Sequence, residues 1–326
     1  MISPSLPAPL KAALDGRLHG LSRNDAAARA AVISRTYRDG GGSGAIRTET
    51  DALAYALARM PATYAAVTAC LNAFFELRPD FAPQSLLDIG AGPGTASFAA
   101  AEAFPSLQRL TLLDRNGALR ALAMELARAD PRLGKLDYGS GEARSVLAQS
   151  DAADLVVASY VIGELTETER DELVALAWSK TSDALLLVEP GTPAGYARIV
   201  AARAQLIANG ARVAAPCPHD SACPLIAPDW CHFAQRLPRS RAHKAIKGAE
   251  LPFEDEKFSY CIVTRAPVPS RPARVLAEPA VGKVEVSAKL CTPHGVRIAK
   301  VPRRDKTGYA VARRWRWGDG AVVEER

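Results

Sequence analysis

The stretch "SLLDIGAGPGTASF", residues 85–98, places a short apolar run directly before three glycines spaced by two. The apolar run predicts a buried β-strand, and the continuation "TASFAAAEAF" predicts a helix after the glycines. Glycine lets the backbone turn sharply between the two elements, and it leaves no Cβ in the way of a ligand. The glycines are Gly90, Gly92 and Gly94, and Asp88 stands two residues before the first of them. This stretch therefore predicts a strand–loop–helix unit that holds a small molecule.

A second acid supports the same interpretation. The next apolar run, "TLLD", ends in Asp114, 20 residues after Gly94, where a carboxylate can accept hydrogen bonds from both hydroxyls of a ribose. Dinucleotide-binding loops carry a further glycine three residues after the second one, and here that position is Thr95. The pattern D-x-G-x-G-x-G resembles instead the first motif of class I methyltransferases, which bind S-adenosylmethionine. A glycine loop that serves only as a tight turn is the structural alternative.

Short apolar runs alternate with helical patterns on either side of this unit. The runs "RLTLLD", "ADLVVASY" and "ALLLVEP" read as buried strands, and "GALRALAMELARA" and "ETERDELVALAWSK" read as the helices between them. Such alternation predicts a parallel, doubly wound sheet, with "FEDEKFSYCIVTRAP" as one more strand. We therefore expect an α/β fold with a class I methyltransferase-like (Rossmann-like) sheet over residues 81–266.

The two flanks have different patterns. Residues 1–80 predict an N-terminal helical region, in which "TETDALAYALARMPATYAAVTACLNAFFEL" begins at a cap of Thr48 or Thr50 and is broken or kinked at Pro61. "RDGGGSGAI" before it predicts a flexible joint. Residues 267–326 predict a small basic β segment, because "VEVSAKLC", "GVRIAKV" and "GYAVARRW" are short strand-like runs separated by turn residues.

The fourth predicted strand, "DLVVASYVIGEL", stands where such a fold carries catalytic side chains. It lacks the Asn/Asp-Pro-Pro-Tyr/Phe pattern of base amino-methylating enzymes, and it contains no cysteine nucleophile for carbon-5 methylation. Six residues are predicted to contact the cofactor, and no catalytic residue is assigned. The six are Asp88, Gly90, Gly92, Gly94, Asp114 and Ser159.

Charge is distributed unevenly along the chain, whose formal net charge is +6. Residues 232–326 hold 20 Lys and Arg against 10 Asp and Glu, whereas the remainder holds 21 against 25. A basic C-terminal part on a slightly acidic body predicts a polyanionic partner, and nucleic acid is the interpretation we favour over a merely solvated surface. Arg239, Arg241, Lys244 and Lys247 are candidate phosphate contacts.

Three of the six cysteines fall within "APCPHDSACPLIAPDWCHF", residues 215–233. Cys217, Cys223 and Cys231 are spaced by six and eight, which is wider than the Cys-x₂₋₄-Cys pairs of zinc ribbons and suits an iron–sulfur cluster held by four thiolates. As fourth ligand, Cys291 at a strand end is better placed than Cys261 inside an apolar strand. His219 and His232 keep a mixed Cys/His zinc site open, and three unconnected buried cysteines are the bland alternative.

Several motifs together carry a family resemblance. "DIGAGPGT", "ASYVIGEL", "VEPGTPAGY", "APCPHDSACPL", "DWCHF" and "KGAELPFEDEKFSY" resemble the methyltransferase-like assembly factors of the mitochondrial small ribosomal subunit and their bacterial relatives. The resemblance implies a class I methyltransferase fold that binds small-subunit rRNA during ribosome maturation. It also implies a 4Fe–4S cluster on Cys217, Cys223 and Cys231, with the last ligand downstream at Cys291.

The leading functional prediction is thus an S-adenosylmethionine-binding, iron–sulfur-containing rRNA methyltransferase of small-subunit assembly. The alternatives are a non-catalytic assembly factor that uses the fold as a binding module, and a zinc-containing methyltransferase of a small molecule. The N-terminus shows no secretory pattern, and no apolar run is long enough to cross a bilayer. We expect a cytoplasmic monomer that binds the immature small ribosomal subunit and no membrane.

Overall fold

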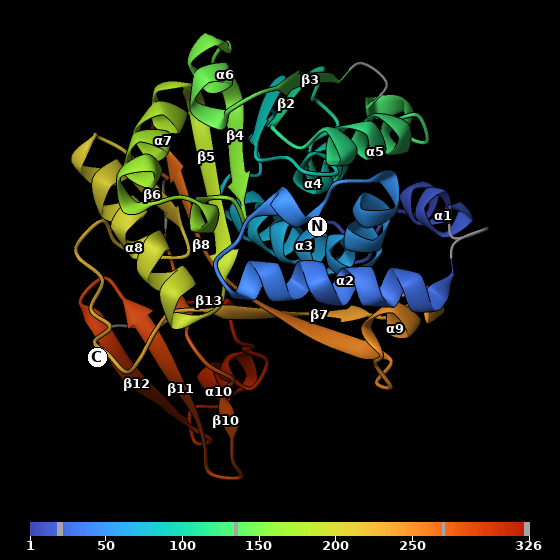
Figure 1. Ribbon diagram of the computed structural model, residues 1–326. Coiled ribbons are helices and arrows are strands. Elements are labelled where there is room, and N and C mark those ends of the chain that lie inside the picture. The colour runs from blue at the N-terminus through green and yellow to red at the C-terminus, as the bar shows by residue number, and fades with distance from the viewer. Residues whose placement is uncertain (18–21, 134–135, 269–270, 323–326) are drawn as a thin grey trace.

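A mixed eight-stranded sheet organises the protein in the computed structural model, which describes all residues except 18–21, 134–135, 269–270 and 323–326 (Figure 1). Five strands run parallel: β1 (Ser85–Ile89), β2 (Arg109–Asp114), β3 (Asp137–Ser140), β4 (Ala153–Ser159) and β5 (Thr181–Pro190). Strand β8 (Phe253–Thr264) runs antiparallel to β5 and also pairs with β6 (Arg212–Ala215) and β7 (Phe233–Pro238). The order β3-β2-β1-β4-β5-β8-β6 is that of the class I methyltransferase fold predicted from the sequence.

Helices cover both faces of this sheet (Figure 1). One face carries α1 (Ala8–Gly16), α2 (Arg23–Arg38), α3 (Glu49–Leu77), α4 (Thr95–Ala103) and α5 (Gly117–Ala127). The other carries α6 (Ala143–Gln149), α7 (Glu167–Ser179) and α8 (Pro193–Ala208). Three short 3₁₀ turns lie at Ser43–Ala45, Pro131–Leu133 and Ile162–Glu164. None of the described helices is both long and apolar enough to span a membrane.

The central strand β1 is covered by helices on both faces, which explains the continuous apolar run in its sequence. All five residues are buried, and successive side chains point to opposite faces. Leu86 belongs to the hydrophobic cluster under α3, α4 and α5, whereas Leu87 and Ile89 belong to the cluster under α6, α7 and α8. A parallel strand covered on both faces has no polar side, so the alternation typical of half-exposed strands is absent.

Helix α3 is continuous over the stretch that the sequence predicts to be helical. Thr48 is its N-cap, since the Thr48 hydroxyl accepts from the Asp51 amide and the Asp51 carboxylate accepts from the Thr48 amide, so the alternative cap Thr50 is wrong. The predicted break at Pro61 is also wrong, because the helix continues to Leu77. Pro61 removes one backbone donor, but the helix is buried on both sides of it, for example at Met60 and Tyr64.

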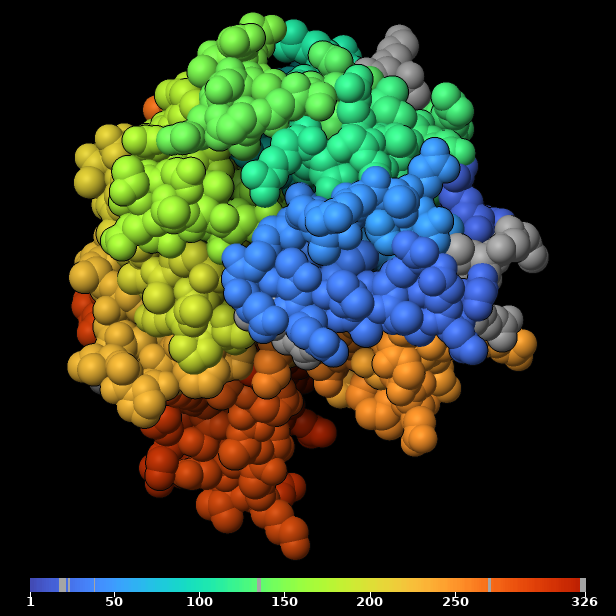
Figure 2. All heavy atoms as spheres, viewed as in Figure 1, coloured from blue at the N-terminus to red at the C-terminus, as the bar shows by residue number. Residues whose placement is uncertain are grey.

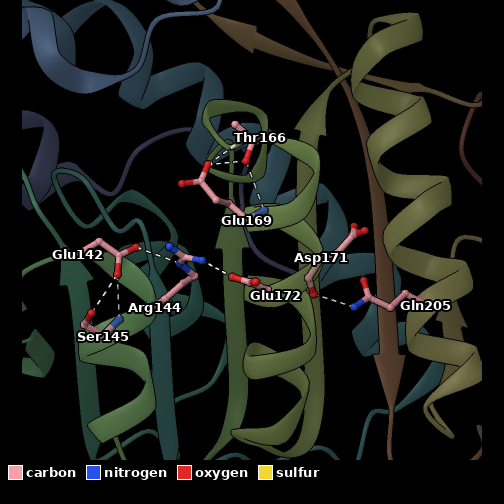
Figure 3. Close-up of polar contacts among 8 residues, drawn as sticks. All are labelled: Glu142, Arg144, Ser145, Thr166, Glu169, Asp171, Glu172 and Gln205. Atoms are coloured by element: carbon pink, nitrogen blue, oxygen red, sulfur yellow. Dashed lines mark hydrogen bonds and ion pairs between the residues drawn. The ribbon is translucent and has the colours of Figure 1, made fainter.

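Polar contacts tie α6, α7 and α8 together along their exposed sides (Figure 3). The guanidinium of Arg144 on α6 contacts Glu142 and reaches Glu172 on α7. The Gln205 amide on α8 donates to the Asp171 carbonyl on α7 at 2.7 Å. Helix α7 itself begins with a capping box in which Thr166 and Glu169 satisfy each other's backbone amides. These contacts fix the layer that covers one face of the sheet.

The C-terminal part forms a second, smaller sheet that projects from the main body (Figures 1 and 2). Its strands are β9 (Ala273–Val275), β10 (Ala280–Val281), β11 (Glu285–Thr292), β12 (Gly295–Pro302) and β13 (Gly320–Ala321). They enclose a hydrophobic cluster of their own around Val275, Leu290 and Trp315. The predicted strand over "GYAVARRW" is wrong. Residues Lys306–Ala312 form helix α10 instead, because the Asp305 side chain caps it by accepting from the Gly308 amide at 2.9 Å.

Asp88 connects the central strand to the helix that follows the glycines. Its side chain is fully buried, and one carboxylate oxygen accepts from the Ser97 hydroxyl at 2.7 Å and from the Ser97 amide at 3.1 Å. Burial raises the pKa of Asp88 from 3.8 to about 7, and the two Ser97 hydrogen bonds oppose that rise. The first turn of α4 is therefore held to β1 by an acid that is half protonated near neutral pH.

This raised pKa makes the stability of the protein depend on pH. The folded state binds a proton at Asp88 more tightly than the unfolded state, so the Asp88 contribution favours folding at low pH and is lost as pH rises from about 4 to about 7. Because of Asp88, the free energy of unfolding of the wild-type protein should fall by about 4 kcal/mol between pH 4 and pH 7. Asp88→Asn has no titrating group at this position and should not show this decrease. Denaturant unfolding of both proteins between pH 4 and pH 8 measures it, and parallel profiles would contradict the assignment.

Candidate functional site

The glycine loop lies at the carboxyl end of β1 and is fastened to β2. The amides of Gly90 and Ala91 both donate to the Leu113 carbonyl, at 2.8 and 3.0 Å. Gly90, Gly92 and Gly94 all have positive φ angles, which side chains of L-residues rarely allow. A Cβ on Gly92 would meet no atom closer than 3.9 Å, so the space beside this peptide is open. The loop therefore presents bare backbone at the edge of the sheet where ligands of open α/β folds bind.

Asp114 at the end of β2 holds the middle of this loop. One of its carboxylate oxygens accepts from the Gly92 amide and the other accepts from the Asn116 amide, both at 2.8 Å. Partial burial raises the pKa of Asp114, while these two hydrogen bonds oppose the rise. The buried Tyr138 hydroxyl donates to the Gly92 carbonyl at 2.8 Å, so the loop is fixed from two sides. Sequence reasoning missed Tyr138, which lies on the short strand β3.

The glycine-rich segment of residues 40–46, which we call the strap, crosses the same edge of the sheet. The Asn116 side-chain amide donates to the carbonyls of Ser43 and Ile46, at 3.0 and 2.9 Å. The Ser43 amide donates to the Glu164 carboxylate at 3.3 Å. Burial raises the pKa of Glu164, and the nearby Asp114 carboxylate adds to the rise. The strap, predicted as a flexible joint, is thus fastened between the ends of β2 and β4.

The carboxyl end of β4 carries Ser159, which is half-buried one residue before a turn with unusual geometry. Tyr160 has a φ of 57°, a left-handed conformation that is uncommon for a residue of its size. Its hydroxyl donates to the Glu256 carboxylate at 3.0 Å, and the Arg59 guanidinium contacts the same oxygen at 3.1 Å. The turn brings Val161 close to Gly90, and a Cβ added to Gly90 would lie 2.4 Å from a Val161 methyl group.

The structure thus brings five of the six residues predicted for the cofactor to the ends of β1, β2 and β4. Gly90, Gly92, Gly94, Asp114 and Ser159 lie at that edge, whereas Asp88 lies beneath it and turns toward α4. Within the described residues, the second carboxylate oxygen of Asp88 has no hydrogen-bond partner. The arrangement places a glycine loop and the Asp114 carboxylate together at this edge, with Asp88 buried beneath them.

Four cysteines line one cavity between the main body and the C-terminal sheet. Cys217, Cys223 and Cys231 come from the segment between β6 and β7, and Cys291 comes from β11. Burial raises the pKa of the Cys291 thiol to about 12, and the neighbouring cysteines add to the rise. Among the residues that the structure describes, no three His, Cys, Asp or Glu side chains are close enough to hold a single metal ion. All six cysteines are free thiols.

The remaining cysteines and histidines lie in different surroundings. Cys70 on α3 is buried in the hydrophobic cluster under α3 and α4, and Cys261 on β8 is buried in the cluster on the opposite face of the sheet. The His219 ring nitrogen lies 3.7 Å from the Cys291 sulfur, whereas His232 stacks on Trp230 with ring centroids 5.0 Å apart. His219 is therefore the histidine that reaches the cysteine cavity.

Basic side chains are concentrated on the C-terminal sheet rather than on α9 (Arg241–Lys247). On and beside α9, Arg239 and Lys247 both contact the Glu254 carboxylate, at 3.2 and 2.5 Å, so these two predicted phosphate contacts are already engaged. Exposed arginines and lysines follow β12 and α10 instead. They are Arg297, Lys300, Arg303, Arg304, Lys306, Arg313, Arg314 and Arg316.

The chain is similar in sequence to mitochondrial proteins of two organisms. It is 32% identical over 299 residues to the human mitochondrial ribosome assembly protein METTL17, covering 83% of this chain and 62% of that protein. It is 26% identical over 327 residues to an Rsm22-cox11 tandem protein of Schizosaccharomyces pombe, covering 84% of this chain and 43% of the other. The chain thus spans 62% of the length of the human relative and 43% of that of the fission-yeast relative.

A solved structure gives a weaker similarity. Magnesium protoporphyrin IX methyltransferase from Synechocystis, with bound S-adenosylmethionine, superimposes with a TM-score of 0.40 at 15% identity, covering 73% of this chain and 97% of the other.

The cytoplasmic location expected from the sequence is wrong. The human and fission-yeast relatives are both mitochondrial proteins. The expectation rested on the absence of a secretory pattern, and the fold of a domain carries no physical record of its compartment.

The sequence profile described as mitochondrial small ribosomal subunit Rsm22 matches residues 49–321, which include both sheets, the glycine loop and all four cysteines of the cavity. The chain therefore belongs to the Rsm22 family.

Proposed function

We propose that this protein acts as a monomer in the assembly of the small ribosomal subunit, binding S-adenosylmethionine at the glycine loop and rRNA on its C-terminal sheet. Methyl transfer to that rRNA is the activity we assign to it. The observation that carries the proposal is the hydrogen bond from the Gly92 amide to Asp114, which holds a carboxylate and the glycine loop together at one edge of the sheet. The human relative, a ribosome assembly protein by name, supports the choice of partner.

The residues at this edge fit S-adenosylmethionine by their chemistry. The cofactor has ribose hydroxyls and an ammonium group, all hydrogen-bond donors, and no phosphate. Asp114 offers a carboxylate to the ribose. The missing Cβ at Gly92 leaves the backbone open to close approach. When bound, the cofactor would supply an electrophilic methyl group.

Replacing the ribose acceptor tests the cofactor site. Asp114→Ala should weaken S-adenosylmethionine binding by about 1.5–3 kcal/mol, roughly 10- to 150-fold, because ribose hydroxyls lose their acceptor and the Gly92 amide loses its anchor. Calorimetric titration measures the affinity. Asp137→Ala, which removes an exposed carboxylate at the other end of the sheet, is the matched control and should bind like wild type. Equal S-adenosylmethionine affinities of wild type, Asp114→Ala and Asp137→Ala would show that Asp114 is not part of the cofactor site.

The C-terminal sheet fits a polyanion by its charge. Eight exposed basic side chains follow β12 and α10, and exposed charges of one sign attract phosphates over a Debye length. Most contacts between proteins and nucleic acids of this kind position the backbone and read no sequence. We therefore assign rRNA binding to this surface and not to Arg239 and Lys247, which Glu254 already neutralises in part.

Charge reversal tests this assignment. The triple variant Arg297→Glu, Arg304→Glu and Arg314→Glu should bind small-subunit rRNA at least about tenfold more weakly, and its log–log salt dependence should be less steep by roughly 1 per lost contact. Filter binding at several salt concentrations measures both quantities. Arg35→Glu, an exposed reversal on α2, serves as control and should keep the wild-type slope. An affinity that does not depend on salt would contradict nucleic-acid binding altogether.

A non-catalytic assembly factor is the second candidate, and the end of β4 favours it. The Tyr160 hydroxyl is engaged by Glu256, and Val161 packs against Gly90, so neither residue is free to act on a substrate. Transfer of label from methyl-labelled S-adenosylmethionine to immature small-subunit rRNA separates the two candidates. Labelled rRNA supports methyl transfer, whereas cofactor and rRNA binding without label supports the binding module.

We also propose that the cysteine cavity holds a 4Fe–4S cluster. Four cysteines surround it, which is the thiolate number that such a cluster takes, and they come from two separate parts of the chain. Tyr196 places its hydroxyl 3.2 Å from the Cys223 sulfur, and hydrogen bonds to sulfur are typical around such clusters. A zinc ion on the same residues or with His219 is the alternative metal.

Single replacements identify the ligands. Cys→Ser at 217, 223, 231 or 291 should each lower the iron content and the visible absorption of anaerobically purified protein, because a three-thiolate site holds the cluster poorly. Limited proteolysis should then cut the C-terminal sheet first, since Cys291 ties it to the main body. Cys70→Ser and Cys261→Ser are the controls and should keep the iron. If Cys261→Ser loses the iron and Cys291→Ser keeps it, the fourth ligand is Cys261 and not Cys291. If the protein carries zinc and neither iron nor sulfide, it does not hold a 4Fe–4S cluster.

A further inference from the structure

Two buried arginines line the cysteine cavity. Arg203 on α8 and Arg274 on β9 expose only 4% and 3% of their surfaces, and both belong to the cavity wall. They reach it from opposite sides, because α8 covers the main sheet and β9 belongs to the C-terminal sheet. Buried arginine is uncommon, and it normally has a carboxylate partner.

No carboxylate accompanies either guanidinium within the described part of the chain. Arg203 donates to the His219 carbonyl at 2.6 Å, and its Nε has no hydrogen-bond partner. Arg274 donates to the carbonyls of Pro216 and Gly318, at 3.0 and 2.7 Å. Carbonyl oxygens satisfy N–H groups, but they carry no net charge. Two positive charges are therefore buried without an acidic counterpart.

The cysteines are the groups that can balance these charges. Both guanidiniums belong to the same cavity wall as Cys217, Cys223, Cys231 and Cys291. Four thiolates that hold a dication are anionic overall. An unpaired charge costs several kcal/mol to bury, so an anionic centre between the two guanidiniums removes a penalty that the cavity otherwise carries.

We propose that Arg203 and Arg274 are the fixed counter-charges of an anionic, all-thiolate centre in the cysteine cavity, and that they make reduction of this centre easier. The inference rests on the cluster proposed above and concerns residues outside its ligand set. Reduction adds negative charge, and a positive charge at short range in a medium of low dielectric constant stabilises the reduced form. Net charge and hydrogen bonds around the sulfurs are among the factors that set the potentials of such centres.

A purely structural role is the competing explanation. Arg274 joins Pro216 to Gly318 and Arg203 holds the His219 carbonyl, so each side chain fastens the cysteine segment through hydrogen bonds alone. A structural role depends on hydrogen bonds, whereas a counter-charge role depends on charge. Lysine separates the two, because it keeps the charge and loses the planar set of donors.

The experiment is a redox titration of the anaerobically reconstituted protein, followed by its visible absorption. Arg203→Gln and Arg274→Gln should each lower the equilibrium constant for reduction about tenfold, a shift of about 59 mV toward more negative potential for one electron. Arg203→Lys and Arg274→Lys should stay close to wild type. Arg212→Gln, which removes an exposed arginine on the neighbouring strand β6, is the matched control and should not move the potential.

Unchanged potentials in both glutamine variants, with iron and sulfide still bound, would overturn the inference and leave the cluster standing. Where a glutamine variant is insoluble, the lysine variant at that position is the test. It keeps the positive charge, so a reduction potential that differs from wild type contradicts the counter-charge role. If wild-type protein binds no iron and sulfide, the proposed cluster fails, and zinc affinity becomes the readout. Each glutamine variant should then bind zinc about tenfold more weakly than wild type. Unchanged zinc affinity in these variants would overturn the counter-charge role, and so would a wild-type protein that binds no metal.

Discussion

Strand β8 connects parts of the molecule that lie far apart in the sequence. Its second half pairs with β5 and β6 inside the main sheet, and its first half extends beyond the sheet to pair with β7. Because side chains alternate along a strand, Glu254 and Glu256 continue the row that Phe258 and Tyr260 begin inside the core. The Glu256 carboxylate accepts hydrogen bonds from Arg59 of α3 and from Tyr160 in the turn after β4, and the Glu254 carboxylate contacts the basic side chains around α9.

The same strand also reaches the cysteine segment. The Ser259 hydroxyl donates to the Cys231 carbonyl at 2.8 Å, on the opposite side of β8 from the phenylalanine and tyrosine rings. A shift of β8 by one residue would exchange its two faces, and it would move the acids, the aromatic rings and this hydroxyl together. The register of one antiparallel strand thus sets the relation between the edge that carries the glycine loop and the cavity that carries the cysteines.

Much of this could be predicted from local patterns, and the rest depended on tertiary contacts. The glycine loop, its two acids and the strand–helix alternation are encoded within a few residues of one another, so the fold class followed from the sequence. The short strand β3 was not foreseen, because its sequence "DYGS" has no apolar run, and Tyr138 was missed with it. The engagement of Arg239 by Glu254 joins positions 15 residues apart through a turn that no pattern marks. Helix α10 looked like a strand because its alternation outweighed a single capping aspartate.

The strap bears on how fast a molecule can reach the glycine loop. Its residues 40–44 include four glycines, and three hydrogen bonds hold the strap at that edge, two from the Asn116 amide and one to the Glu164 carboxylate. Each such bond is worth about 1 kcal/mol net, so the three together oppose opening of the strap by about 3 kcal/mol, a factor of roughly 150 at equilibrium, and the burial of Ile46 adds to this. Access to that edge therefore depends on local opening of the strap and does not require the unfolding of a helix.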